Sequence, residues 1–236
     1  MLGFIEENKE IDKDDKNDLK NTIIKFKNSE DFLKESLAFY TSENKYVYDF
    51  NKAMRLIGEG LEKLSFLIGP MYYTMVRYLK KENPDLNMNE NMILYRNIVI
   101  NKYDLNIYYM ALDDIICFSS FSSTSLNENF ITTKNALEVN QLKEEEKISL
   151  LMILNYNHLP EFSDPMGMRI ESFSVNPEEE EILLFPFTFI KVKTLNKIDD
   201  YHYELICDII NKRSILEFGL KKGKKVKIVN DLLITE

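Results

Sequence analysis

The sequence predicts an α+β fold in which a helical segment precedes a strand-rich core. Apolar residues recur every three or four positions between residues 46 and 78, which is the spacing of one buried helix face. From residue 93 onward the pattern changes to short runs rich in β-branched and aromatic residues, separated by polar turns. Because the strands follow the helices as a block and do not alternate with them, the order favours α+β over a doubly wound α/β fold.

The length and charge of the chain limit its organisation and its partners. With 236 residues, it has the size of one large domain or of one domain with an appendage. We expect a polar, flexible N-terminus at 1–22 and one domain at 23–236, made of a helical layer (23–90) and a strand-rich core (91–236). The net charge of −9 argues against a nucleic-acid-binding protein, because such a protein needs a basic face.

The helical layer is predicted to contain two helices that meet at Gly69-Pro70, because proline interrupts the apolar period there. Asn83-Pro84 then ends the layer. The strand candidates share β-branched or aromatic residues and flanking turns, and they are 93–98, 115–125, 148–155, 169–174, 181–185, 187–195, 201–210 and 225–230. A helix plus a loop is expected between residues 96 and 123.

Several kinds of site and location are disfavoured by what the sequence contains. The longest apolar run, 182–190, is far shorter than the roughly 20 residues of a membrane span, and no signal peptide is evident, so we expect a cytoplasmic protein without a membrane partner. Gly58 and Gly60 lack the third glycine of a dinucleotide fingerprint. Cys117 and Cys207 form no metal-binding pattern, and His158 and His202 lie in unrelated segments. We therefore expect neither a Rossmann site nor a metal.

Arg96 is a single arginine within the otherwise apolar strand 93–98. A buried arginine needs an anion or a carboxylate as its partner, whereas an arginine on the solvent side of an edge strand needs none. Taken alone, the solvent-facing explanation is the commoner one.

Two further strings carry polar groups that suit chemistry. Residues 118–126 read FSSFSSTSL, and in a strand Ser123 and Ser125 share one face with Phe121, where the hydroxyls can hold a carboxylate or a ribose. Residues 176–186 read NPEEEEILLFP, and a period of two puts Glu179 and Glu181 on one face. Two carboxylates on one face repel each other, which separates their pKa values and their roles. Each string alone is more commonly a turn or a solvated patch.

Taken in order, the three strings resemble the R-S-E class of mono-ADP-ribosyltransferases. LYR at 94–96 is similar to the first strand of that family, FSSTSL at 121–126 to its second motif, and EEEEILLFPFTFIKV at 178–192 to its glutamate strand and the strand that follows. The resemblance covers about residues 90–235. It implies a mostly antiparallel, split β-sheet core of the ADP-ribosyltransferase type behind the helical layer, with NAD as co-substrate and no metal.

The resemblance also implies a role for each matched residue. Arg96 would pair with the NAD pyrophosphate, and Ser123 would orient the glutamate and contact the nicotinamide-side ribose. Glu181 would bind the ribose 2′-hydroxyl and stabilise the positive charge that develops as nicotinamide leaves. Glu179 would orient and deprotonate the acceptor guanidinium, which implies transfer to a protein with an exposed arginine.

Two parts of the NAD site are less closely matched. Asn97 stands where family members usually have glycine, at a position whose backbone contacts the nicotinamide amide. Either Phe121 or an aromatic residue between 173 and 181 is expected to stack on the nicotinamide.

The glutamate register also has an alternative, since Glu178 and Glu180 would replace the chosen pair if the strand shifted by one residue.

The resemblance leaves four functions open. The first is transfer of ADP-ribose to arginine, and the second is an NAD glycohydrolase in which water replaces the acceptor. The third is an inactive binding module that keeps the fold, with Asn97 marking decay of the pocket. The last is an unrelated α+β domain whose glutamates form a solvated face. We favour the first, because the three motifs occur together and in the family's order.

Overall fold

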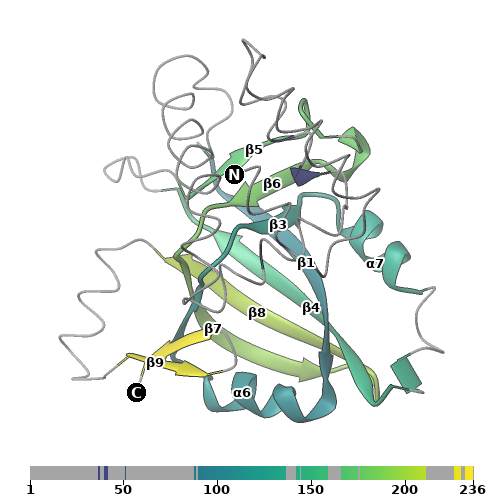
Figure 1. Cartoon of the computed structure of the whole chain (residues 1–236), viewed down its shortest axis with the longest axis vertical. Helices are drawn as coiled ribbons and strands as arrows, with labels where there is room; N and C mark the ends of the chain where they lie inside the picture. Colours follow the sequence, from purple (N-terminus) through teal and green to yellow (C-terminus); the bar gives the residue numbers. More distant parts are fainter. Residues whose placement is uncertain are drawn as a thin grey trace, which may run out of the picture.

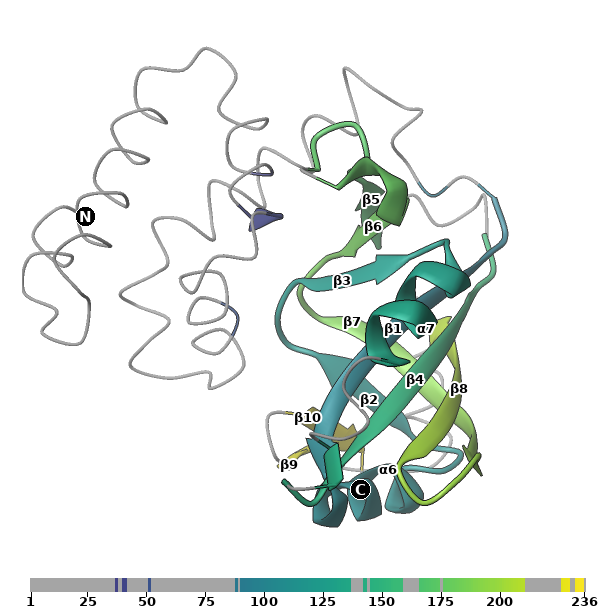
Figure 2. The ribbon, with the colours of Figure 1, turned by 90° about the vertical axis from the view of Figure 1, so that its right-hand side faces the viewer.

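The computed structural model describes most of the strand-rich part of the chain (Figures 1 and 2). The described residues are 90–136, 142–143, 145–158, 166–174, 176–210, the strands at 226–229 and 232–235, and positions 37, 40, 41, 51 and 88. The predicted flexible N-terminus at 1–22 lies outside them. The predicted helical layer at 23–90 also lies outside them, apart from the single positions just given.

Ten strands and four short helical segments make up the described structure. The strands are β1 (Met92–Asn101), β2 (Ile115–Phe118), β3 (Ser122–Ser125), β4 (Lys147–Tyr156), β5 (Gly167–Arg169), β6 (Glu181–Leu184), β7 (Thr188–Lys197), β8 (His202–Ile210), β9 (Val226–Val229) and β10 (Leu232–Thr235). The helical segments are η2 (Lys102–Asp104), α6 (Leu105–Met110), α7 (Glu128–Ala136) and η3 (Pro177–Glu179). Among the described residues, no helix is long and apolar enough to cross a membrane.

The strands form one hydrogen-bonded sheet in the order β5-β6-β3-β1-β4-β8-β7-β2-β10-β9. The β4–β8 pair is parallel and the other neighbouring pairs are antiparallel. The sheet is therefore mixed, although the antiparallel pairing expected for it dominates. Strand β8 lies beside β4 in parallel because it continues an antiparallel hairpin with β7, which fixes its direction.

The shortest strand pairing in the sheet is the one between β1 and β3, where one residue pair, Tyr95 with Ser125, joins the two strands. Strands β5, β6 and β3 lie on one side of this junction, and the longer strands β1, β4, β8 and β7 lie on the other. Figure 2 shows β3 running at a steep angle to β1 and β4. The two parts of the sheet thus meet at the place where the serine-rich motif and the arginine strand come together.

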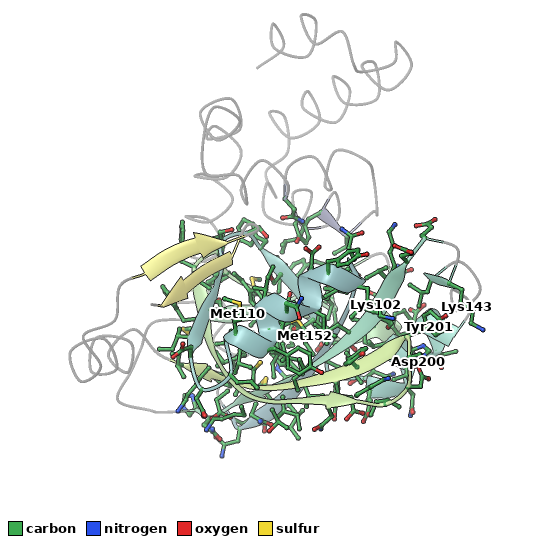
Figure 3. All side chains as sticks on the ribbon, turned by 90° about the horizontal axis from the view of Figure 1, so that it is seen from below. Lys102, Met110, Lys143, Met152, Asp200 and Tyr201 are labelled. Carbon is green, nitrogen blue, oxygen red and sulfur yellow. The ribbon has the colours of Figure 1, made fainter. Side chains whose placement is uncertain are left out.

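The core lies on one face of the longer strands. Side chains of β8 alternate between buried and half-buried positions, as a period of two predicts, with Tyr203, Leu205, Cys207 and Ile209 pointing into the core. Leu105 and Tyr108 of α6 join the same cluster. Figure 3 shows the curved sheet with Met152 of β4, a buried residue, in its interior.

The structure corrects several predicted boundaries. The single strand expected at 115–125 is two strands, because β2 pairs with β7 and β10 whereas β3 pairs with β6 and β1, and the chain leaves one set of partners at 119–121 to reach the other. The strand expected at 169–174 is largely a turn, since β5 ends at residue 169. The helix expected between residues 96 and 123 is confirmed as α6, whereas α7 and β10 were not predicted.

Replacing Gly167 in β5 by alanine should destabilise the fold. An added Cβ would lie 2.8 Å from the Leu183 carbonyl oxygen and 3.2 Å from the Leu184 Cα, both backbone atoms of β6. Because the backbone must shift to make room, we expect a loss of about 1–3 kcal/mol in the free energy of unfolding, measured by urea denaturation. Ser172→Ala, at an exposed position in the next turn, serves as the control. Equal stability of the two variants would contradict the close β5–β6 approach.

Candidate active site

Glu181 is a buried carboxylate at the start of β6. Glu181 as a whole is only 3% exposed. In the antiparallel pairing of β3 with β6, Ser125 lies opposite Glu181 and Ser123 opposite Leu183, so these four residues share one face. The alternate serines of β3 therefore project from the same face of the sheet as the Glu181 carboxylate on the neighbouring strand.

Side-chain hydroxyls from two different elements bind the Glu181 carboxylate. The hydroxyl of Ser123 on β3 hydrogen-bonds to it, and so does the hydroxyl of Ser174 in the turn after β5. Hydrogen bonds of this kind favour the ionised form of a carboxyl group and lower its pKa. The carboxylate is thus held from the sheet on one side and from a turn on the other.

Arg96 reaches the same place from β1. Its Nη1 donates a hydrogen bond of 2.7 Å to the backbone carbonyl oxygen of Ser123. Its positive charge lies close enough to Glu181 to lower the pKa of that carboxyl group. The arginine, the hydroxyl and the carboxylate that the sequence singled out therefore converge, although they are spread over 85 positions of the chain (96 to 181).

Glu179 is placed next to this cluster by a hydrogen bond to its backbone. The Ser125 hydroxyl donates to the Glu179 carbonyl oxygen at 2.5 Å, and the negative charge of Glu179 raises the pKa of Glu181. Glu179 ends the 3-10 segment η3, and Glu180 then adopts a left-handed conformation (φ 47, ψ 51) before β6 begins. The two acids therefore do not share a strand face, as a period of two suggested, and a turn brings them together instead.

The alternative glutamate register places its acids differently. Glu178 and Glu180 are exposed, whereas Glu179 is half-buried and Glu181 is buried. The structure therefore groups Glu179 and Glu181, not Glu178 and Glu180, with Arg96 and Ser123.

The pKa of Glu181 is raised from 4.5 to about 7. Burial is the largest cause, because it disfavours the charged form, and the charge of Glu179 adds to it. The hydrogen bonds from Ser123 and Ser174 and the charge of Arg96 act in the opposite direction. The balance leaves a carboxyl group that titrates near neutral pH, as carboxyl groups in active sites commonly do.

The side chains of Asn97 and Phe121 make contacts within the protein. Asn97 Oδ1 accepts a hydrogen bond of 2.9 Å from the Ser149 hydroxyl on β4, and its φ is not positive, so its backbone conformation does not require glycine. Phe121 is 1% exposed, and its ring packs edge-on against Tyr40 and Phe185 at centroid distances of 6.0 and 6.5 Å. That ring offers a ligand no exposed face.

Known proteins match this chain in structure but not in sequence. No protein-family model and no curated protein matches the sequence. The ADP-ribosyltransferase Vis, a toxin from Vibrio splendidus, matches in structure with a TM-score of 0.58 at 14% identity, over 88% of this chain and 83% of that one. The ADP-ribosyltransferase HopU1 from Pseudomonas syringae matches with a TM-score of 0.56 at 14% identity, over 82% and 83%. An ADP-ribosyltransferase from Clostridium botulinum gives 0.52 at 15% identity, over 81% and 92%.

The chain has the ADP-ribosyltransferase fold. The three proteins come from different bacteria, and each is an ADP-ribosyltransferase. The fold implied by the three sequence motifs is thereby confirmed. In this ADP-ribosyltransferase fold, the residues that the motifs supplied lie at the junction between β1, β3 and β6.

Ser174 is a polar group beside Glu181 in this ADP-ribosyltransferase fold that the sequence did not predict. Its segment was predicted as a strand, and in a strand its hydroxyl has no evident partner. The usable signal was the group of turn-forming residues Ser174, Asn176 and Pro177. Among the described residues, no group of three or more His, Cys, Asp or Glu side chains is arranged to hold a metal ion.

Glu181→Gln should stabilise the folded protein at alkaline pH. A carboxyl group with a pKa of about 7 when folded and 4.5 when unfolded contributes stability below pH 4.5 and loses it as the pH rises through 7. Glutamine does not titrate, so the variant should gain roughly 3 kcal/mol over the wild type between pH 4 and pH 9. Urea denaturation at both pH values measures this difference. A constant difference would show that the buried carboxyl does not titrate near neutrality.

Proposed function

We propose that this protein is an NAD-dependent mono-ADP-ribosyltransferase that transfers ADP-ribose to protein arginine and releases nicotinamide. The observation that carries the proposal is the convergence of Arg96, Ser123 and Glu181 from three strands, with Glu179 beside them. The fold shared with several ADP-ribosyltransferases supports it. Vis has also been solved in complex with agmatine, a small guanidine compound.

In the proposed reaction, the bond between ribose C1′ and the nicotinamide nitrogen breaks, and nicotinamide leaves with the bonding electron pair. C1′ becomes cationic in the transition state, and the ionised Glu181 carboxylate lies ready to stabilise that charge. A fixed carboxylate in a buried position acts strongly, because little water screens it. Ser123 holds the carboxylate through its hydrogen bond.

The other groups bind the two substrates. Arg96 binds the Ser123 carbonyl through Nη1, and we assign its guanidinium fork to the NAD pyrophosphate as well. We assign the Asn97 backbone to the nicotinamide amide. The Asn97 side chain is hydrogen-bonded to Ser149. Because the Phe121 ring is buried, we assign stacking on the nicotinamide to Phe173, which is half-buried in the turn after β5.

Glu179 is the proposed base for the acceptor. A guanidinium nitrogen attacks C1′, forms the new C–N bond and gives up one proton, which the Glu179 carboxylate accepts. Glu179 is half-buried, and its backbone is held by Ser125, so its side chain lies between the buried site and the surface. A surface arginine of a partner protein can approach such a group without entering the core.

Glutamate variants separate transfer from hydrolysis. With labelled NAD and agmatine, we expect the wild type to label agmatine and Glu181→Ala to lose about 10²–10³-fold in rate, the usual scale for losing a charge-stabilising group. Glu179→Ala should stop labelling and still release nicotinamide, because water can replace the acceptor.

Glu178→Ala, at an exposed position one residue away, is the matched control and should behave as the wild type. Labelling that survives Glu181→Ala would overturn the proposal. A rate of nicotinamide release that changes neither with agmatine nor with the Glu179→Ala substitution would favour an NAD glycohydrolase instead. Absence of NAD binding in calorimetry would favour a non-catalytic binding module.

The pH dependence of the reaction should follow the ionisation of Glu181. Only the ionised carboxylate stabilises the cationic transition state, and its pKa is about 7 in the free protein. We expect kcat/KM for NAD to fall about ten-fold for each pH unit below 7 and to level off above it. Initial rates of nicotinamide release from pH 5 to pH 9 test this. A profile that is flat down to pH 5 would show that this carboxyl is not required in its ionised form.

A further inference from the structure

Ser174 connects the Glu181 carboxylate to a turn that also leads to Glu179. Ser174 Oγ accepts a hydrogen bond of 3.1 Å from the Asn176 backbone N–H. Its one hydroxyl proton is then directed to the Glu181 carboxylate, to which it hydrogen-bonds. The Ser174 hydroxyl therefore accepts a hydrogen bond from the turn and donates one to the carboxylate.

The segment between β5 and β6 is a series of hydrogen-bonded turns. The backbone N–H groups of Phe173 and Ser174 both donate to the Ile170 carbonyl oxygen, at 2.9 Å. The Glu179 N–H donates to the Asn176 carbonyl oxygen at 3.1 Å. Asn176 thus hydrogen-bonds to Ser174 through its N–H and to Glu179 through its carbonyl, and so links the two residues.

The two ends of this segment are fixed to β6 and to β3. At one end the Ile170 N–H donates to the Glu181 carbonyl oxygen at 2.9 Å. At the other end the Ser125 hydroxyl holds the Glu179 carbonyl. Between these ends, the Ser174 hydroxyl joins the segment to the Glu181 side chain, and Ser123 joins that side chain to the sheet.

We propose that Ser174 is a positioning residue that couples the acceptor-side turn bearing Glu179 to the Glu181 carboxylate. This inference rests on the proposed function and adds a regulatory link within the same site. Ser123 fixes the carboxylate whether or not an acceptor is present, because it lies within the β3–β6 ladder. Ser174 fixes it only while the turn keeps its arrangement, so an acceptor that seats on Glu179 sets the orientation of Glu181.

A role in positioning predicts a selective defect. Ser174→Ala removes one hydrogen bond to a charged group and leaves Ser123 and Arg96 in place, so NAD should still bind with a KM within about two-fold of the wild type. The kcat for transfer to agmatine should fall about ten-fold, the scale of one lost hydrogen bond to an ionised group. The pKa of Glu181 should rise, because a group that lowers it is gone.

The experiment compares Ser174→Ala with Ser172→Ala, a serine at an exposed position of the same turn. One readout is a carbon-13 NMR titration of the Glu181 carboxyl, assigned by its absence in Glu181→Gln. The other is the separation of kcat from KM for NAD with agmatine as acceptor. We expect the Glu181 titration to move to higher pH, and kcat to fall, in Ser174→Ala alone.

The two readouts also separate this inference from the proposed function. If the wild type labels no acceptor, the proposed function fails, yet the titration still tests the hydrogen bond from Ser174. An unchanged Glu181 titration in Ser174→Ala, or the same kinetic change in both serine variants, would overturn the inference. A rise in KM for NAD with an unchanged kcat would do so as well, since it would place Ser174 in NAD binding.

Discussion

The burial of one ionisable carboxylate constrains much of the described structure. Glu181 is 3% exposed, and this burial disfavours its charged form. Hydrogen bonds from Ser123 and Ser174 and the nearby guanidinium of Arg96 stabilise the charged form. These three groups come from a strand, a turn and another strand. Each of those elements therefore reaches one point, at the junction of β1, β3 and β6.

The junction between β3 and its neighbours is held by side chains as well as by the backbone ladder. Thr124, at 2% exposure, donates its hydroxyl proton to the Ile182 carbonyl oxygen at 2.7 Å, and Ser125 does the same for Glu179. On the other side, β1 meets β3 at one residue pair, and the hydrogen bond from Arg96 to Ser123 reinforces it. The groups proposed to carry the reaction are thus also groups that hold the two parts of the sheet together.

The sequence predicted the long half-buried strands well and the breaks between them poorly. In β8 buried apolar residues alternate with half-buried residues that are mostly polar, so alternation in the sequence reports position in the structure directly. At 119–121 the chain changes partners although no glycine or proline marks the break, because pairing partners leave no local trace in the sequence. The same break explains Phe121, whose predicted face assumed one continuous strand. Ser174 was missed because its partner, Glu181, is fixed by the pairing of β5 with β6 and not by spacing.

In the proposed function, the charges around Glu181 favour a cationic ligand group. With a pKa of about 7, the carboxyl is about half ionised at neutral pH in the free protein. A positive group beside it, such as the nicotinamide ring of NAD, favours the ionised form, and by thermodynamic reciprocity the ionised form binds that group more tightly. The negative charge of Glu179 disfavours ionisation of Glu181. A second cation that pairs with Glu179 offsets this charge, so it also favours the ionised form of Glu181. In the proposed reaction, the donor and the acceptor therefore each help to ionise the carboxylate that the chemistry requires.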